Sequence, residues 1–494
     1  MDPPESRPLE GLEALFACFH ERLGDLTTCS ATRIDGLSKL PSPTNDIEAR
    51  AKAVIKSLVI SHPLLRSTVR LDDAGKRHLA ALDDESLWPE LQIEYEQSDV
   101  TRPVETVENE EETGWQYSLR REHDHRFVHN EALVKFLLHF PADGNDSVYL
   151  ILSAHHGLFD GRSLVVLAKD VVAAIRRSIA QGLAEHTCDS ERIPPSLQRS
   201  SSLRNLMGES FPKSSGMDNS AGFPDANKTY AFDHHTKLTT PSEVRYLYRK
   251  LSDGTVKKLV AQCRCDGVRL TSTIIAAFTG QGLHCHLQRP EVTDSVGFQC
   301  CVDLRRYIDN DERDSTQLLG NLYSIADLTV PVLPDDYPEN DYGSRETLVK
   351  RSHAIQKELE EQLTDRRFLA GAHAACVDEL ANGADNLCNK VEVEGYHGRD
   401  FYSGVSNLGK IDINNGVEEA PEVSAQAIFA TEYWFMTRLA RVGTFCFFSC
   451  NYIPGHGMCI VFTRPHPICS LESAKGIMER TISALEAYAG VLNK

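Results

Sequence analysis

Residues 148–156, VYLILSAHH, form a mainly apolar run typical of a β-strand, in which successive side chains point to opposite faces. The residues expected on one face of this strand are Val148, Leu150, Leu152, Ala154 and His156. The run 133–140 before it is also strand-like, and residues 141–146 between the two are rich in turn formers. The pattern predicts a hairpin that places His156 at the end of a buried strand, on its apolar face.

Helical spacing follows this strand directly. Apolar residues recur at intervals of three and four along positions 164–179, which predicts a helix that begins near Ser163. Residues 155–161, HHGLFDG, form the short connection between strand and helix. Gly157 and Gly161 in this connection can adopt backbone angles that other residues resist.

The rest of the chain mixes strands and helices without strict alternation, so an α+β fold with layered helices and sheets is predicted. The elements expected in the second half are strands at 244–251 and from Val296, helices at 256–263, 271–280, 344–363 and 472–488, and a hairpin of 444–452 with 458–463. Proline, serine and glycine are frequent along the crossover between the halves. The length of 494 residues suits two domains, and the predicted boundaries are 1–184, a linker at 185–242, and 243–494.

A neutral imidazole in a partly dry pocket is a good general base near pH 7. His156 could take a proton from a hydroxyl or amine as that group attacks an activated acyl carbon, and return it to a leaving thiolate. Asp160 has two possible roles. It could orient His156 directly, or form an ion pair that fixes the loop while backbone groups hold the imidazole. The alternative for His156, a core histidine with no chemical role, is disfavoured by the full seven-residue pattern at a strand-to-helix junction.

The pattern H-H-x-x-x-D-G resembles that of the superfamily of CoA-dependent acyltransferases. This superfamily includes chloramphenicol acetyltransferase, plant and fungal alcohol acyltransferases, and peptide-synthetase condensation domains. The resemblance implies that His156 is the catalytic base, that His155 supports it, that Asp160 is structural, and that Gly161 leaves room for a substrate channel. It also implies two chloramphenicol-acetyltransferase-like domains that form a pseudo-dimer with a central tunnel.

Four further segments follow the order of that superfamily: HPLLR at 62–66, CVDLR at 301–305, LGN at 319–321 and SNLG at 406–409. The resemblance implies that Arg305 is the partner of Asp160, and that Ser406 and Asn407 are candidates for the channel wall. The DFGWG string of the plant enzymes is absent from the sequence, which favours the fungal or bacterial alcohol acetyltransferase branch.

The formal net charge of −19 disfavours nucleic-acid binding, which depends on neutralising phosphates. The phosphates of CoA would need a local basic patch, for which Lys257 and Lys258 at the start of a predicted helix are candidates. A solvated helix face is the alternative for these lysines. Fourteen cysteines and an N-terminus without signal-peptide features predict reduced thiols in the cytoplasm, and no apolar run is long enough to span a membrane. A monomer is expected, because the pseudo-dimer is internal.

Three other patterns carry less weight. GVSNLG at 404–409 is not a hydrolase nucleophile elbow, because Leu408 stands where that motif needs glycine. The histidine-rich stretches 123–129 and 233–235 lack a full set of zinc ligands, so no metal site is predicted. Cys263 and Cys265 are expected to be one buried and one exposed thiol.

The predicted function is transfer of an acyl group, expected to be acetyl, from acyl-CoA to a hydroxyl of a small natural product. The expected mechanism is direct attack with His156 as general base. Acyl-CoA is a cosubstrate, and no permanently bound cofactor is expected. Two alternatives stay open: a stand-alone condensation-type domain that takes its acyl group from a carrier protein, and a non-catalytic binding member of the superfamily.

Overall fold

The computed structural model describes residues 6–40, 43–96, 112, 114–142, 146–181, 243–286, 295–307, 318–331, 333, 344–364, 388–389, 401–414, 428–439, 444–466 and 469–491. The chain divides into two compact units. Unit 1 comprises Met1–Leu203, Arg305–Leu322 and Lys410–Arg438. Unit 2 comprises Arg204–Leu304, Tyr323–Gly409 and Leu439–Lys494.

This division differs from the boundaries predicted from the sequence. Two segments of the second half, Arg305–Leu322 and Lys410–Arg438, belong to unit 1. The physical reason for the second segment is that its strand β12 (Phe429–Thr437) pairs antiparallel with β2 (Thr27–Asp35) and completes a sheet of unit 1. The predicted linker at 185–242 lies outside the described residues.

Unit 1 is built on a five-stranded sheet in the order β12-β2-β7-β6-β5. Its other strands are β7 (Ser147–His155), β6 (Val134–Phe140) and β5 (Leu91–Tyr95). The predicted hairpin is confirmed, because β6 pairs antiparallel with β7. All nine residues of the central strand β7 are buried, which requires cover on both faces of the sheet.

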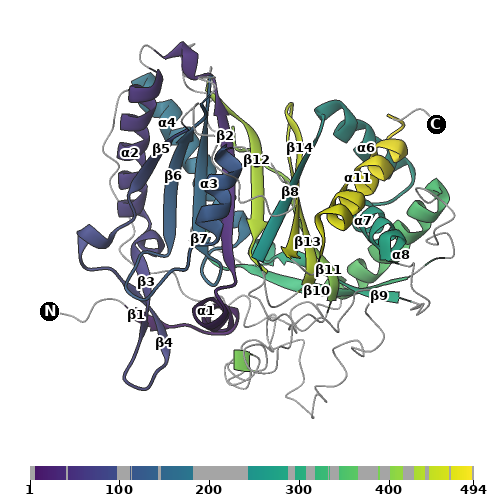
Figure 1. Ribbon diagram of the computed structural model, residues 1–494, viewed down its shortest axis with the longest axis horizontal. Coiled ribbons are helices and arrows are strands. Elements are labelled where there is room, and N and C mark those ends of the chain that lie inside the picture. The colour runs from purple at the N-terminus through teal and green to yellow at the C-terminus, as the bar shows by residue number, and fades with distance from the viewer. Residues whose placement is uncertain are drawn as a thin grey trace. The chain divides into compact units, whose positions relative to one another are not determined.

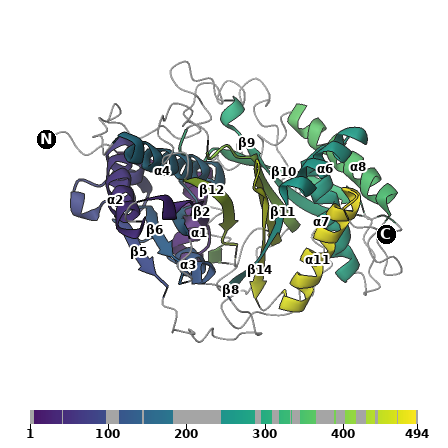
Figure 2. The ribbon, with the colours of Figure 1, turned by 90° about the horizontal axis from the view of Figure 1, so that it is seen from above.

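Helices supply that cover. Figure 2 shows α2 (Pro43–Ser61) and α4 (Gly161–Gln181) on one face of the five-stranded sheet and α3 (Gly114–His123) on the other. On the α3 face, Trp115 stacks on Tyr149 of β7 with 4.8 Å between ring centroids. The segment HPLLR at 62–66 follows α2 and contains the short helix η2 (Pro63–Arg66). The remaining elements of unit 1 are α1 (Leu12–Leu23), the short helices η1 (Leu37–Lys39), η3 (Glu85–Leu87) and η6 (Arg305–Tyr307), and the small sheet β1-β4-β3, with β1 Ser6–Pro8, β4 Arg77–Ala81 and β3 Ser67–Leu71.

Unit 2 is built on a six-stranded sheet in the order β10-β9-β11-β13-β14-β8. Its strands are β10 (Tyr323–Pro331), β9 (Ser295–Asp303), β11 (Phe401–Lys410), β13 (Thr444–Ile453), β14 (Gly457–His466) and β8 (Glu243–Leu251). Its helices, gathered on one side of this sheet in Figure 1, are α6 (Asp253–Cys265), α7 (Leu270–His286), α8 (Arg345–Thr364) and α11 (Leu471–Tyr488). Phe278 of α7 packs against Phe298, Phe448 and Phe462 of the sheet, which closes the core between the two layers.

The α+β class predicted from the sequence is confirmed. Each of the two units consists of a main sheet with helices layered on it. Each strand and helix expected in the second half is found, with ends that differ by a few residues. In the described part of the chain, no helix combines the length and the apolar character needed to cross a membrane.

Candidate active site

The C-terminal end of β7 is held by backbone hydrogen bonds on both sides. His155 N–H donates to the carbonyl of Leu133 and His156 N–H to the carbonyl of Leu26, each at 2.9 Å. Leu26 has a φ of 65°, a left-handed conformation that is uncommon for a residue with a side chain. Its own N–H donates to the carbonyl of Arg438, just after β12, at 3.0 Å. The position of His156 is therefore fixed by three neighbouring segments of unit 1.

The ring of His156 has one orientation and one tautomer. Its Nδ1 lies 3.0 Å from the carbonyl oxygen of Phe159, three residues along the same connection. A carbonyl oxygen can only accept, so Nδ1 carries the proton and Nε2 is the unprotonated nitrogen of the neutral ring. The side chain is 6% exposed, and the ring of Phe16 from α1 lies 5.3 Å away between centroids.

Burial lowers the pKa of His156 below its usual 6.5, although the Phe159 carbonyl and the charge of Asp160 act in the opposite direction. The ring is therefore neutral at pH 7, with the lone pair on Nε2. A histidine in this state can act as a general base.

Asp160 is 3% exposed, and each of its two carboxylate oxygens accepts two hydrogen bonds. Arg305 donates Nη1–H to Oδ2 at 2.8 Å and Nη2–H to Oδ1 at 2.9 Å. The backbone N–H of Ser163 reaches Oδ1 at 2.8 Å, and that of Leu322 reaches Oδ2 at 2.9 Å. Four bonds fill the acceptor capacity of a carboxylate. Burial alone would raise the pKa of Asp160, but Arg305 and the two N–H groups lower it, so the group is ionised.

The bond from Ser163 also explains where α4 begins. Asp160 accepts from the backbone N–H three residues ahead, which is the geometry of an N-cap residue. The helix therefore starts at Gly161, two residues before the position expected from hydrophobic spacing. Of the two roles open for Asp160, the observed contacts are those of the second: an ion pair that fixes the loop, while a backbone carbonyl holds the imidazole.

Arg305 is 1% exposed, and each of the three nitrogens of its guanidinium donates a hydrogen bond. Besides Asp160, its Nε donates to the carbonyl of Leu318 at 3.0 Å and its Nη2 to Ser163 Oγ at 3.0 Å. Ser163 Oγ in turn donates to the carbonyl of Gly320 at 2.8 Å. These contacts join the start of α4 to the segment 318–322 within unit 1.

His155 points to a different neighbourhood from His156. Its Nδ1 accepts the N–H of Gly157 at 3.0 Å, so its proton is on Nε2. Its ring lies 4.4 Å from that of His20 on α1. His20 is also fixed as a neutral ring, because Nδ1 lies 3.0 Å from the Asp25 carbonyl while Nε2 accepts the N–H of Phe127 at 2.9 Å. Burial lowers the pKa of His20 to about 4 and that of His155 well below its usual value.

Gly161 stands against an aromatic ring. A Cβ added at this position would lie 2.6 Å from Cζ of Phe435 on β12, a side chain that is 3% exposed. The resemblance to the acyltransferases implies that Gly161 leaves room for a channel, whereas in the structure the direction in which a side chain would point from Gly161 is occupied by the Phe435 ring. The glycine is needed here for close packing between α4 and β12.

Four of the predicted site residues belong to unit 2, whereas His156, Asp160 and Arg305 belong to unit 1. Asn407 donates from Nδ2 to Thr271 Oγ1 at 3.0 Å and accepts the N–H of Gly409 at 2.8 Å, which ties β11 to the start of α7. Ser406 is buried within β11, a strand position that excludes a nucleophile elbow between strand and helix.

Lys257 and Lys258 are exposed on α6. Lys257 pairs with Asp253 one turn earlier at 2.7 Å, an arrangement typical of a solvated helix face.

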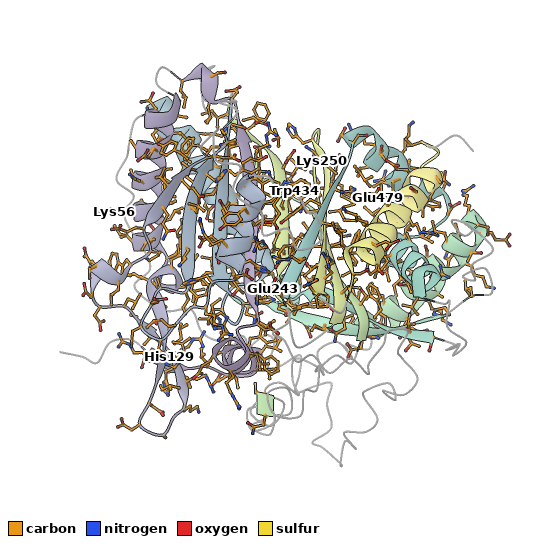
Figure 3. The ribbon with its side chains drawn as sticks, viewed as in Figure 1. Lys56, His129, Glu243, Lys250, Trp434 and Glu479 are labelled. Carbon is orange, nitrogen blue, oxygen red and sulfur yellow. The ribbon has the colours of Figure 1, made fainter. Side chains whose placement is uncertain are left out.

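The histidine-rich stretch 123–129 lies at the end of α3 and directly after it. Among the residues that the structure describes, no group of three or more His, Cys, Asp or Glu side chains is placed to hold a metal ion. His123 is fully buried, and His129, labelled in Figure 3, lies 3.8 Å from Glu21. The second stretch, 233–235, lies outside the described residues. Cys263 is buried and Cys265 exposed, as predicted.

Several residues around His156 were not identified from the sequence. Phe16, His20 and Phe435 come from segments far from the motif, and no local pattern marks them. Ser163 could have been found from its place in the sequence. It is the third residue of α4, the helix that begins directly after the capping Asp160, and its hydroxyl accepts a hydrogen bond from Arg305, the partner of that Asp.

Trp434 of β12, labelled in Figure 3, stacks with Trp115 of α3 at 5.8 Å between centroids. This contact, like that of Phe435 with Gly161, depends on the pairing of β12 with β2.

Solved structures similar to this one include an acetyltransferase and condensation domains. TRI3 trichothecene 15-O-acetyltransferase from Fusarium sporotrichioides is 12% identical, with a TM-score of 0.65 over 98% of this chain and 95% of that one. The first condensation domain of the CDA synthetase is 14% identical, with a TM-score of 0.62 over 99% and 96%. Polyketide synthase associated protein 5 from Mycobacterium tuberculosis is 14% identical, with a TM-score of 0.60 over 99% of both chains.

No protein-family model matches the chain, and no curated protein matches it in sequence. The structural likeness therefore defines the class of fold, which this chain shares over nearly its whole length with structures of an acetyltransferase and of condensation domains.

Proposed function

We propose that this protein is an acyltransferase that moves an acyl group from a thioester to a hydroxyl, with His156 as the general base. The observation that carries the proposal is the hydrogen bond between His156 Nδ1 and the Phe159 carbonyl. It leaves Nε2 as the basic nitrogen of a buried, neutral ring whose orientation is fixed. The shared fold supports the same reaction class.

The reaction proceeds by direct attack. The acceptor hydroxyl gives its proton to Nε2 as its oxygen bonds to the thioester carbonyl carbon, which forms a tetrahedral oxyanion and an imidazolium. The oxyanion then collapses, the C–S bond breaks, and the leaving thiolate takes the proton from Nε2. The imidazolium is transient and is stabilised by the Phe159 carbonyl and by the nearby charge of Asp160.

The proposed donor is acetyl-CoA or another acyl-CoA, and the proposed acceptor is a hydroxyl of a small natural product. The presence of TRI3 trichothecene 15-O-acetyltransferase among the similar structures supports both. Lys257 and Lys258 remain the candidates for contact with CoA phosphates. If they bind CoA, Lys257→Ala with Lys258→Ala raises the KM for acetyl-CoA and leaves kcat unchanged. Lys56, exposed on α2 of unit 1 and labelled in Figure 3, serves as a control lysine.

A second candidate is transfer from a carrier protein. Two observations favour it: condensation domains recur among the similar structures, and Lys257 is already paired with Asp253. This candidate predicts weak affinity for free CoA and rapid turnover of an acyl group presented on a carrier protein.

The test measures release of free thiol from acetyl-CoA with a panel of hydroxylated acceptors. Wild type is compared with His156→Asn, in which the amide nitrogen can replace Nδ1 as donor to Phe159 but no base remains. Acceptor-dependent release in the wild type, absent in the folded variant, supports the proposal. Release at the wild-type rate by His156→Asn would contradict it. Release only from an acylated carrier protein supports the second candidate.

A further inference from the structure

Asn321 has a buried amide and lies between Gly320 and Leu322, two residues that the Asp160 network holds. Its side chain is 3% exposed, and within the described residues neither Oδ1 nor Nδ2 has a hydrogen-bond partner. A buried amide without partners destabilises a folded protein, and such groups are rare in native structures. The sequence marked Gly320-Asn321 as a short motif but gave Asn321 no role.

The backbone on both sides of Asn321 is fixed by the Asp160 network. Gly320 N–H donates to Ser163 Oγ at 3.0 Å, and the Gly320 carbonyl accepts from Ser163 Oγ at 2.8 Å. Leu322 N–H donates to Asp160 Oδ2 at 2.9 Å. Gly320 has a φ of 150°, a conformation open essentially to glycine alone. The Asn321 side chain is therefore carried on a rigid segment.

One peptide group links this segment to His156. The carbonyl of the Phe159–Asp160 peptide accepts from His156 Nδ1 at 3.0 Å, and its N–H donates to the Gly320 carbonyl at 3.4 Å. With standard backbone dimensions, the nitrogen of Asn321 lies no more than about 11 Å from His156 Nδ1. An Asn side chain and a bound acyl group together are long enough to bridge that separation.

The proposed reaction needs a hydrogen-bond donor for the oxyanion, and the backbone donors next to His156 are already engaged. The N–H groups of residues 155–160 donate to Leu133, Leu26, His155 Nδ1, the His155 carbonyl twice, and Gly320. Those of Gly320 and Leu322 donate to Ser163 and Asp160. A side-chain donor whose N–H is not occupied by another protein group can supply this hydrogen bond.

We infer that Asn321 is a catalytic residue, whose Nδ2–H donates a hydrogen bond to the carbonyl oxygen of the acyl donor. This inference rests on the proposed function. The bond strengthens as negative charge develops on that oxygen in the tetrahedral state, so its effect falls mainly on kcat. Removal of one such donor lowers kcat roughly 100- to 1,000-fold in enzymes that use an oxyanion hole.

The test compares Asn321→Leu with Asn414→Leu. Asn414 is a matched control from unit 1, because its amide is hydrogen-bonded to Ala430 at both ends, with Nδ2–H donated to the carbonyl and Oδ1 accepting the N–H, both at 2.8 Å. For Asn321→Leu we expect kcat to fall roughly 100- to 1,000-fold with little change in KM, and the Tm to stay the same or rise. For Asn414→Leu we expect a lower Tm and unchanged kcat for the folded enzyme.

Other outcomes overturn the inference. If Asn321→Leu lowers the Tm as Asn414→Leu does and keeps kcat, Asn321 is a structural amide. If His156→Asn abolishes transfer but Asn321→Leu does not, the proposed function stands and only the role of Asn321 fails. If the wild type transfers no acyl group from acetyl-CoA or from an acylated carrier protein, both fail.

Discussion

Asp160 and Arg305, 145 positions apart in the sequence, form a buried ion pair with two hydrogen bonds of 2.8 and 2.9 Å. The pair joins Asp160, which caps α4, to Arg305, the first residue of the short helix η6. Its geometry also fixes the backbone of the 318–322 segment, through Leu322 and Gly320. We therefore expect loss of the pair to lower the stability of the protein and to shift His156, which lies four residues before Asp160 in the chain.

The stability of unit 1 is predicted to depend on both partners of this pair. Asp160→Ala leaves the guanidinium of Arg305 buried without its counter-charge, which typically costs about 3–5 kcal/mol. Asp160→Ala combined with Arg305→Met is expected to destabilise by less than the sum of the single changes, because each single variant leaves an unpaired buried charge and the double variant leaves none. Urea unfolding measures the free energies, and strict additivity would contradict the assigned coupling.

The pH dependence of the rate is predicted to follow His156. Protonation of Nε2 removes the base, so kcat/KM rises with pH through the pKa of this ring and is flat above it. Burial lowers that pKa, so the midpoint of the acid limb is expected below 6.5. The rate is measured only over the pH range in which circular dichroism is unchanged. A midpoint above 7 would show that His156 is not the buried base described above.

Stability is predicted to fall in acid because of His20. Its folded pKa of about 4 is below the 6.5 of the unfolded chain, so the unfolded state binds the proton more readily. The stabilisation is complete above pH 6.5, is lost as the pH falls from 6.5 to about 4, and amounts to about 3 kcal/mol. For His20→Asn, the slope of the unfolding free energy against pH between pH 6.5 and about 4 should fall by the amount that corresponds to one proton. An unchanged slope would assign the acid sensitivity to other groups.

Close packing of Gly161 against Phe435 predicts a specific rescue. Gly161→Ala places a methyl group on the Phe435 ring, and overpacking of this kind costs about 1–3 kcal/mol. Phe435→Leu in the same chain should restore part of the lost stability. Gly254→Ala is the control, because a Cβ added at Gly254 would lie 3.8 Å from its nearest neighbour, Ser252 Oγ, which is an ordinary contact distance. If Gly161→Ala and Gly254→Ala have equal Tm values, the packing argument is wrong.

Much of the local structure was predictable because it depends on short-range pattern. Alternating apolar residues predicted the β6–β7 hairpin and the position of His156, and helical spacing predicted α4. The start of that helix was misplaced by two residues, because the cap comes from Asp160, a residue to which hydrophobic periodicity assigns no role. The predicted pairing of Arg305 with Asp160 is present, but it followed from resemblance and not from any pattern in the residues.

The sequence by itself determined the strand-to-helix junction that carries His156 and Asp160, since period-two and helical spacing act over a few residues. Only the tertiary structure decided the rest of the site. Strand pairing brought β12 into the sheet of unit 1 and set Phe435 against Gly161. Burial fixed the neutral state of His20, and the Asp160 network placed the amide of Asn321. Such contacts join residues hundreds of positions apart, and they form because apolar faces and buried charges must find partners that local sequence does not name.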